Sequence, residues 1–183
     1  MRMIVRLSGL LAITAAAACA SVAAPAGDIN AGLVRAGVGV AGVELGMTSE
    51  QVEKTLGLAI SRNATPDGRV VFMSFHASEN FGVYFDEESG RVRMIIVAVR
   101  SGLICTEYDA CLYREGDLAK VKAHYGSKLV RFVDRDGSVV YRVLTSSSPR
   151  KALTEFTPNE ERDGIVQVAI LYWDRPIDAS SFD

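Results

Sequence analysis

The side chains that could carry out catalysis in this sequence are few and scattered. The chain has two histidines, His76 and His124, and neither has a sequence neighbour arranged to activate a serine. Nucleophilic catalysis needs a nucleophile, a base and a group that orients the base. The serines at 146–148 precede Pro149 and have the composition of a turn. We therefore expect no catalytic residue and no enzyme. A triad assembled in space around His76 or His124 is the alternative.

Sequence motifs for metals, phosphates and dinucleotides are also missing. The sequence has no glycine-rich phosphate loop, no dinucleotide fingerprint and no paired metal ligands at a known spacing. Residues 134–137 (Asp-Arg-Asp-Gly) resemble the start of a calcium loop, but Thr145 stands at loop position 12, where an EF-hand needs Glu. We interpret this run as a hairpin turn, and the sequence predicts no cofactor and no metal.

The first 26 residues have the pattern of a secretory signal peptide. Arg2 and Arg6 precede an apolar run over residues 7–20. That order is typical of export signals, and the run is shorter than the roughly 20 residues that span a bilayer. We expect a protein that is periplasmic or secreted.

The end of this leader contains two cleavage motifs and one cysteine. Small residues occupy cleavage positions at 18–20 and at 24–26, and we favour the second, which leaves Gly27 as the N-terminus. The residues before Cys19 resemble a degenerate lipobox, so Cys19 is a possible lipidation site. An outer-membrane lipoprotein is therefore the alternative, and membrane contact is expected only if Cys19 is lipidated.

Removal of the leader leaves two cysteines, Cys105 and Cys111. An even pair in an exported chain is most simply a disulfide, which here would close a loop over residues 106–110. A redox pair or a metal site are the alternatives. The spacing differs from Cys-x-x-Cys, and no histidine cluster accompanies the pair.

Composition excludes further classes of function. The 183 residues include 20 Lys and Arg against 22 Asp and Glu, a net charge of −2. This balance lacks the basic surface that nucleic-acid binding needs. Without residues 1–26 the balance is 18 basic against 22 acidic residues, a net charge of −4. The 49% share of hydrophobic residues argues against disorder.

Two stretches of the mature chain match each other at an offset of 69 residues. Val52 corresponds to Val121, and Gly57 to Gly126. The other matches are Asp67-Gly68 with Asp136-Gly137, Val70-Val71-Phe72 with Val139-Val140-Tyr141 and, at an offset of 74, Gly90-Arg91-Val92 with Gly164-Ile165-Val166. Internal similarity of this kind predicts a repeated structural unit.

Each stretch is expected to begin with a short helix. Thr48 and Gln51 form a capping-box pattern, and Gly57 is expected to end the first helix. Asp117 is expected to cap the second helix, and Gly126 to end it. Neither helix is long enough to be stable alone, so both must pack on a sheet.

Four strands are expected after each helix, because acid–glycine turns separate β-rich runs. The expected strands are 58–63, 69–76, 81–86 and 91–100 in the first stretch, and 128–134, 138–145, 150–157 and 165–173 in the second. The predicted fold class is α+β: two tandem helix-plus-four-strand antiparallel units form one curved sheet with helices on one face. The expected organisation is a signal peptide (1–26), a flexible segment (27–41), a first unit (42–100), a Cys-containing connector (101–115), a second unit (116–175) and a C-terminal tail (176–183).

Two motifs carry a family resemblance. Residues 42–52 (Gly-Val-Glu-Leu-Gly-Met-Thr-Ser-Glu-Gln-Val), followed by Leu56-Gly57, resemble the opening of the BamE (SmpA/OmlA) family of small bacterial outer-membrane lipoproteins. Residues 85–92 (Phe-Asp-Glu-Glu-Ser-Gly-Arg-Val) resemble the later hairpin of that family. The tandem arrangement is similar to the β-lactamase inhibitor proteins, in which two such units form one curved eight-stranded sheet.

The resemblance covers 42–100 and, more loosely, 115–173. It implies a protein that holds other proteins and is not an enzyme. The chain departs from the BamE pattern because it has two units and only a degenerate lipobox at Cys19. No contact residue can be carried over from the inhibitor proteins.

Aromatic side chains on the predicted sheet are candidate interface residues. Phe72, His76 and Tyr141 lie on matching strands, and Tyr84 lies on a neighbouring strand. We predict that they share the sheet face away from the helices, where exposed aromatic residues are typical interface anchors. In the alternative, these aromatics are core, and the set containing Met73 is the open face.

The sequence therefore favours an exported, non-catalytic protein-binding module of the bacterial cell envelope, serving assembly or inhibition, with another protein as its partner. The alternative is a periplasmic small-molecule or lipid-binding module, with a small hydrolase third.

Overall fold

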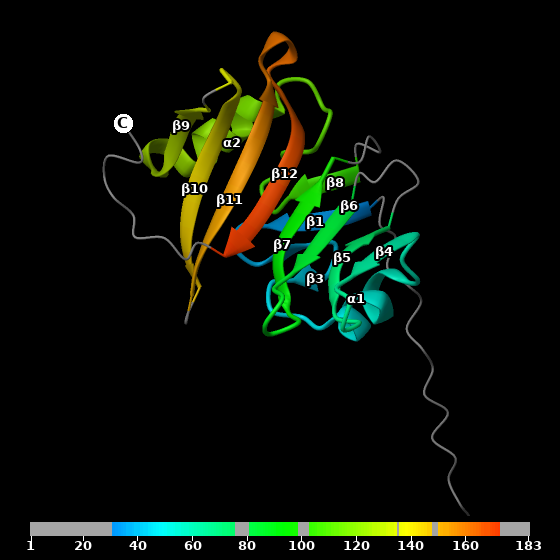
Figure 1. Cartoon of the computed structure of the whole chain (residues 1–183). Helices are drawn as coiled ribbons and strands as arrows, with labels where there is room; N and C mark the ends of the chain where they lie inside the picture. Colours follow the sequence, from blue (N-terminus) through cyan, green and yellow to red (C-terminus); the bar gives the residue numbers. More distant parts are fainter. Residues whose placement is uncertain (1–30, 76–80, 99–102, 135, 148–149, 173–183) are drawn as a thin grey trace, which may run out of the picture.

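The computed structural model describes residues 31–75, 81–98, 103–134, 136–147 and 150–172. The fold is mixed: two open sheets of mostly antiparallel strands and two α-helices (Figure 1). The predictions for the leader (1–26), Cys19, His76 and the tail (176–183) fall outside the described residues.

An eight-stranded antiparallel sheet is the main element of the fold. Its order is β4-β5-β6-β7-β12-β11-β10-β9, so two runs of four sequential strands meet where β7 pairs with β12 (Figure 1). The strands are β4 (Ser61–Ala64), β5 (Val70–Ser74), β6 (Phe81–Phe85), β7 (Val92–Val97), β9 (Leu129–Val133), β10 (Val139–Ser147), β11 (Arg150–Asn159) and β12 (Gly164–Tyr172). All eight were expected from the sequence, with small differences at their ends.

Helix α1 (Ser49–Leu56) begins and ends as the sequence predicts. The Thr48 hydroxyl accepts a hydrogen bond from the Gln51 N–H, and the Gln51 side chain accepts one from the Thr48 N–H. Together these bonds satisfy two backbone donors that a helix start leaves unpaired. Gly57 ends the helix with φ +88°, a region that favours glycine. Val52, fully buried, joins the helix to the core.

Helix α2 (Asp117–Tyr125) ends at Gly126 as predicted, but the prediction that Asp117 caps it is wrong. The N-cap is Gly116, and Asp117 is the first helical residue. Its carboxylate accepts a hydrogen bond from the Cys111 N–H instead, because the segment before the helix folds back over its first turn. Leu118, fully buried, packs into the core.

A second, four-stranded sheet was not predicted. Its order is β3-β2-β1-β8, built from β1 (Ala31–Arg35), β2 (Gly39–Val40), β3 (Val43–Glu44) and β8 (Leu103–Thr106). The expectation of a flexible segment over 27–41 is therefore wrong for β1 and β2, and the connector 101–115 contains a strand. These strands are ordered because their apolar side chains, Val34, Val40, Val43 and Ile104, enter the same core as the large sheet.

The turn between β1 and β2 packs against the core face of the large sheet. The Gly37 N–H donates a 2.8 Å hydrogen bond to Oγ1 of Thr154, which is fully buried on β11. Gly37 has φ +70°, and a Cβ on it would lie 1.7 Å from Oγ1 of Thr145. The two sheets therefore meet at a contact that only glycine fits.

One core joins both sheets and both helices. Side chains from the two four-strand runs, including Met73 and Phe156, share it with Val52 of α1 and Val121 of α2. Among the described residues, neither helix is long and apolar enough to cross a membrane.

Substitution of Gly37 tests the contact between the sheets. Gly37→Ala is expected to lower the free energy of unfolding by about 1–3 kcal/mol more than Gly68→Ala, the cost typical of overpacking. Gly68 is the matched control, since it has φ +85° but no atom within 4 Å of a built Cβ. Urea denaturation of the two variants measures the difference, and equal losses would contradict the packing seen at Gly37.

Candidate interaction surface

The large sheet has one face on the core and a second face turned away from it, here called the open face. On β6 the core side chains are Phe81, Val83 and Phe85, so Gly82 and Tyr84 face the other way, since side chains alternate along a strand. The pairing register then shows which residues of the other strands lie on the open face, because residues paired across antiparallel strands share a face.

A continuous apolar row crosses six strands of the open face. Each member is the registered partner of the next, from β5 through β6, β7, β12 and β11 to β10. The members are Phe72, Tyr84, Met94, Leu171, Leu153 and Leu144. With about 4.8 Å between strands, the apolar row is about 24 Å long. Five of its side chains are half-buried, and Leu153, the fifth of the six members, is only 1% exposed.

Aromatic contacts lie towards both sides of the open face. At the β5 side the rings of Phe72 and Tyr84 are in contact, with centroids 4.8 Å apart and ring planes tilted by 49°. At the β9 side the Arg142 guanidinium lies 3.9 Å from the Phe132 ring centroid and donates from Nε to Oε2 of Glu155 at 3.1 Å. This ion pair is largely buried, with 16% and 20% of the two side chains exposed.

The prediction that Tyr141 shares this face is wrong. Tyr141 pairs with Phe156 on the core face and is only 9% exposed, with Nζ of Lys122 from α2 over its ring at 5.1 Å. The alternative placement of Met73 on the open face is also wrong, because Met73 is fully buried in the core.

A β-bulge explains the error at Tyr141. Ala64 pairs with Val70 but Asn63 pairs with Phe72, so one extra residue is inserted in β5. The register of β9 with β10 has no such shift. A bulge moves every later side chain to the other face. Phe72 and Tyr141 therefore match in sequence but point to opposite sides.

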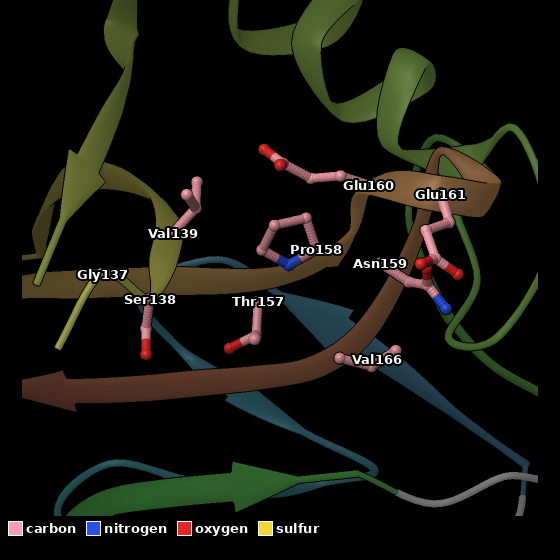
Figure 2. A pocket seen from close by; sticks show the side chains of 9 residues that line it. All are labelled: Gly137, Ser138, Val139, Thr157, Pro158, Asn159, Glu160, Glu161 and Val166. Carbon is pink, nitrogen blue, oxygen red and sulfur yellow. The ribbon is translucent and has the colours of Figure 1, made fainter.

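Two pockets of similar size lie at the ends of hairpins. One, of about 550 Å³, is lined by Phe72, Tyr84 and Met94 of the apolar row and by Asp86, Glu87 and Glu88 of the β6–β7 turn, with Val71, Phe85 and Arg93. The other, of about 530 Å³, lies where the β9–β10 turn approaches the β11–β12 turn (Figure 2). Its lining residues are Gly137, Ser138, Val139, Thr157, Pro158, Asn159, Glu160, Glu161 and Val166.

The Cys105 and Cys111 sulfur atoms lie 2.02 Å apart, the distance of a disulfide bond. Asp109 lies within 4.8 Å of both sulfurs, so three potential metal ligands are grouped here. A disulfide removes both thiolates as ligands, because metals bind the deprotonated thiol.

Charged groups attach the disulfide loop to α2. The Asp117 carboxylate, 2% exposed, accepts hydrogen bonds from the Cys111 N–H and from Arg114 Nε, and lies 3.1 Å from Lys120 Nζ. Arg114 and Lys120 also bind Asp109 and lower the pKa of its carboxyl below the usual range. A buried carboxylate with three such partners is satisfied, and its position is structural.

His124 has aromatic neighbours in the structure. Its ring stacks on Tyr108 of the disulfide loop with centroids 3.9 Å apart and meets the edge of Tyr125 at 4.7 Å. Within the part of the chain that the structure describes, the contacts of His124 are with these two aromatic rings. His124 thus packs the loop against α2, while His76 lies outside the described residues.

Sequence reasoning missed four members of the apolar row, Met94, Leu144, Leu153 and Leu171. Alternation within each strand marks them, but the strands are apolar on both faces. Only the register across strands shows that these side chains form one row.

Comparison with protein-family models, with curated proteins and with solved structures finds no match to this chain. The resemblance to the BamE and β-lactamase inhibitor families therefore rests on the sequence motifs alone, and function has to be argued from the geometry.

The two aromatic residues that match in sequence should behave differently on truncation. Tyr141→Ala is expected to cost about 3–5 kcal/mol of unfolding free energy, as for a buried aromatic side chain, and Phe72→Ala clearly less. Chemical denaturation compares them. If Phe72→Ala is the more destabilising, the assignment of the two faces is incorrect.

Proposed function

We propose that the chain is an exported, non-catalytic protein-binding module of the bacterial cell envelope, and that it binds its partner with the open face. The apolar row is the observation that carries the proposal. Five of its six side chains are half-buried and Leu153 is buried, and none of the six belongs to the core cluster shared by the two sheets. Partly exposed apolar side chains that gather on one face of a folded protein are typical of an interaction site.

The composition of the open face supports a protein partner. Tyr84 and Phe72 supply aromatic anchors, and aromatic residues and arginine are enriched where proteins meet. Arg142 is already oriented by Phe132 and Glu155, so little side-chain entropy would be lost if it contacts a partner.

We further propose that the two four-strand runs are equivalent units. A constant difference of 73 relates residues 84–88 and 93, which line one pocket, to residues 157–161 and 166, which line the other. The order of the sheet is also symmetric about the β7–β12 pair. Both observations are expected of a duplicated helix-plus-four-strand unit that forms one curved sheet with helices on one face.

A small apolar molecule or lipid is the second candidate ligand. The pocket of about 550 Å³ supports it, because its size is typical of ligand sites and three members of the apolar row line it. A protein partner is preferred because the row continues over three further strands beyond that pocket.

Site-specific photo-crosslinking in cells that export the protein tests the proposed interface. A benzoylphenylalanine in place of Tyr84 is expected to give one discrete protein adduct, since this side chain lies within the apolar row. The matched control replaces Glu50, which is exposed on α1 outside the open face. Adducts of equal pattern at both positions, or none at Tyr84, would count against binding at this face.

Intact mass measurement tests the proposed export. The mature protein is expected to begin at Gly27, to carry no acyl group and to be two hydrogens lighter than the reduced chain, because Cys105 and Cys111 are joined. Iodoacetamide should modify neither cysteine until a reductant is added. A lipid mass on Cys19 would instead establish a lipoprotein.

A further inference from the structure

The two outer strands of the large sheet are protected to different degrees. β4 is short and polar, with Arg62 and Asn63 at its centre, and it contains the register shift between Asn63 and Ala64. Short length, charge and bulges are the devices that stop a sheet edge from pairing further. β9 is longer, keeps an unbroken register with β10, and carries Val130, Phe132 and Val133.

On its outer side β9 presents backbone groups that pair with no other strand within the described residues. The Asp134 N–H donates to the Ser138 carbonyl at 2.8 Å, which fixes the alternation of ladder bonds between β9 and β10. The N–H groups of Arg131 and Val133 then point away from β10. Within the described ranges, β10 is the one strand that pairs with β9. An extended backbone is the group that complements such an edge.

We propose that β9 receives an extended segment of another protein, which adds a strand to the large sheet. The side chains of β9 define the segment. Arg131, 52% exposed, is at the centre of β9, and its guanidinium lies 3.9 Å from Oε1 of Glu160, an exposed and long ion pair. An acidic residue directly opposite Arg131 on an added strand would compete with Glu160 for the guanidinium, so an acid is expected there. Val133, 48% exposed, and the half-buried Val130 and Phe132 call for apolar residues on either side.

A second copy of this chain is a poorer occupant than another protein. If the β9 strands of two copies paired antiparallel over all five residues, Arg131 of one copy would lie directly opposite Arg131 of the other. Like charges paired across strands are destabilising. A segment with an apolar–acidic–apolar pattern has no such conflict, and it would also extend the open face past Phe132.

This edge is distinct from the open-face interface, so the inference does not depend on the proposed function. A segment bound at β9 would be held by main-chain hydrogen bonds, and the charge of Arg131 would select its sequence.

The test uses two fluorescein-labelled peptides, Ser-Thr-Val-Ile-Glu-Ile-Val-Thr-Ser and its twin with Lys in place of Glu, titrated against the mature protein by fluorescence anisotropy. The Glu peptide is expected to bind about threefold to fivefold more tightly, the ratio that one cross-strand charge pair supplies. Arg131→Glu should invert this preference. Arg62→Glu on β4 is the matched control and should leave it unchanged.

A backbone variant separates strand pairing from simple charge attraction. Val133→Pro removes an outward N–H and no bond of the β9–β10 ladder, so it should abolish peptide binding. Hydrogen exchange at Arg131 and Val133 should slow when the Glu peptide binds. Four results would each overturn the proposal. They are no binding of either peptide, the same preference in Arg131→Glu, unchanged hydrogen exchange at Arg131 and Val133, and peptide-induced dimers of the chain. Arg131→Glu keeps the test decisive if Val133→Pro does not fold.

Discussion

The antiparallel ladder between β7 and β12 is the interaction on which the rest of the structure depends. It joins two meanders of four strands, each preceded by a helix, into one sheet. Because side chains alternate along each strand, the ladder adds to both faces at once. Val97 and Val168 meet within the core, and Met94 and Leu171 continue the apolar row on the other side. Without this ladder there would be two small sheets, and no surface would span six strands.

Hydrogen bonds hold both the disulfide loop and the β1–β2 turn in place. Both attach irregular chain to the core face, one through Asp117 and the other through Gly37. Burial of a carboxylate or of the Thr154 hydroxyl is costly unless hydrogen bonds are made, and in each case a backbone N–H makes one. The core face is thereby filled by the chain itself, and the opposite face and the β9 edge are the surfaces that we propose for a partner.

Local signals in the sequence predicted the local structure well. The capping box at Thr48, the terminating glycines and the acid–glycine turns depend on neighbours within a few residues, and the elements that they define are present. The errors came from features that such signals do not mark. Asp117 was assigned to its own helix, but its carboxylate is held by Cys111, six residues earlier. Tyr141 was placed with Phe72 because the bulge that separates their faces adds one residue without leaving a turn signal. Strand β1 was missed, and with it the small sheet, because its partner β8 lies about 70 residues away, while β2 and β3 have only two residues each.

A direct measurement of the β7–β12 ladder tests the central claim, that the two meanders form one sheet with a continuous apolar row. Methyl and amide nuclear Overhauser effects can be recorded on the mature protein in solution. The account predicts contacts between the Met94 and Leu171 methyl groups, together with slow amide exchange along both strands. The account would be contradicted if the Met94 and Leu171 methyl groups gave no such contact and the β7 amides that face β12 exchanged rapidly. The two halves would then not be joined in this way.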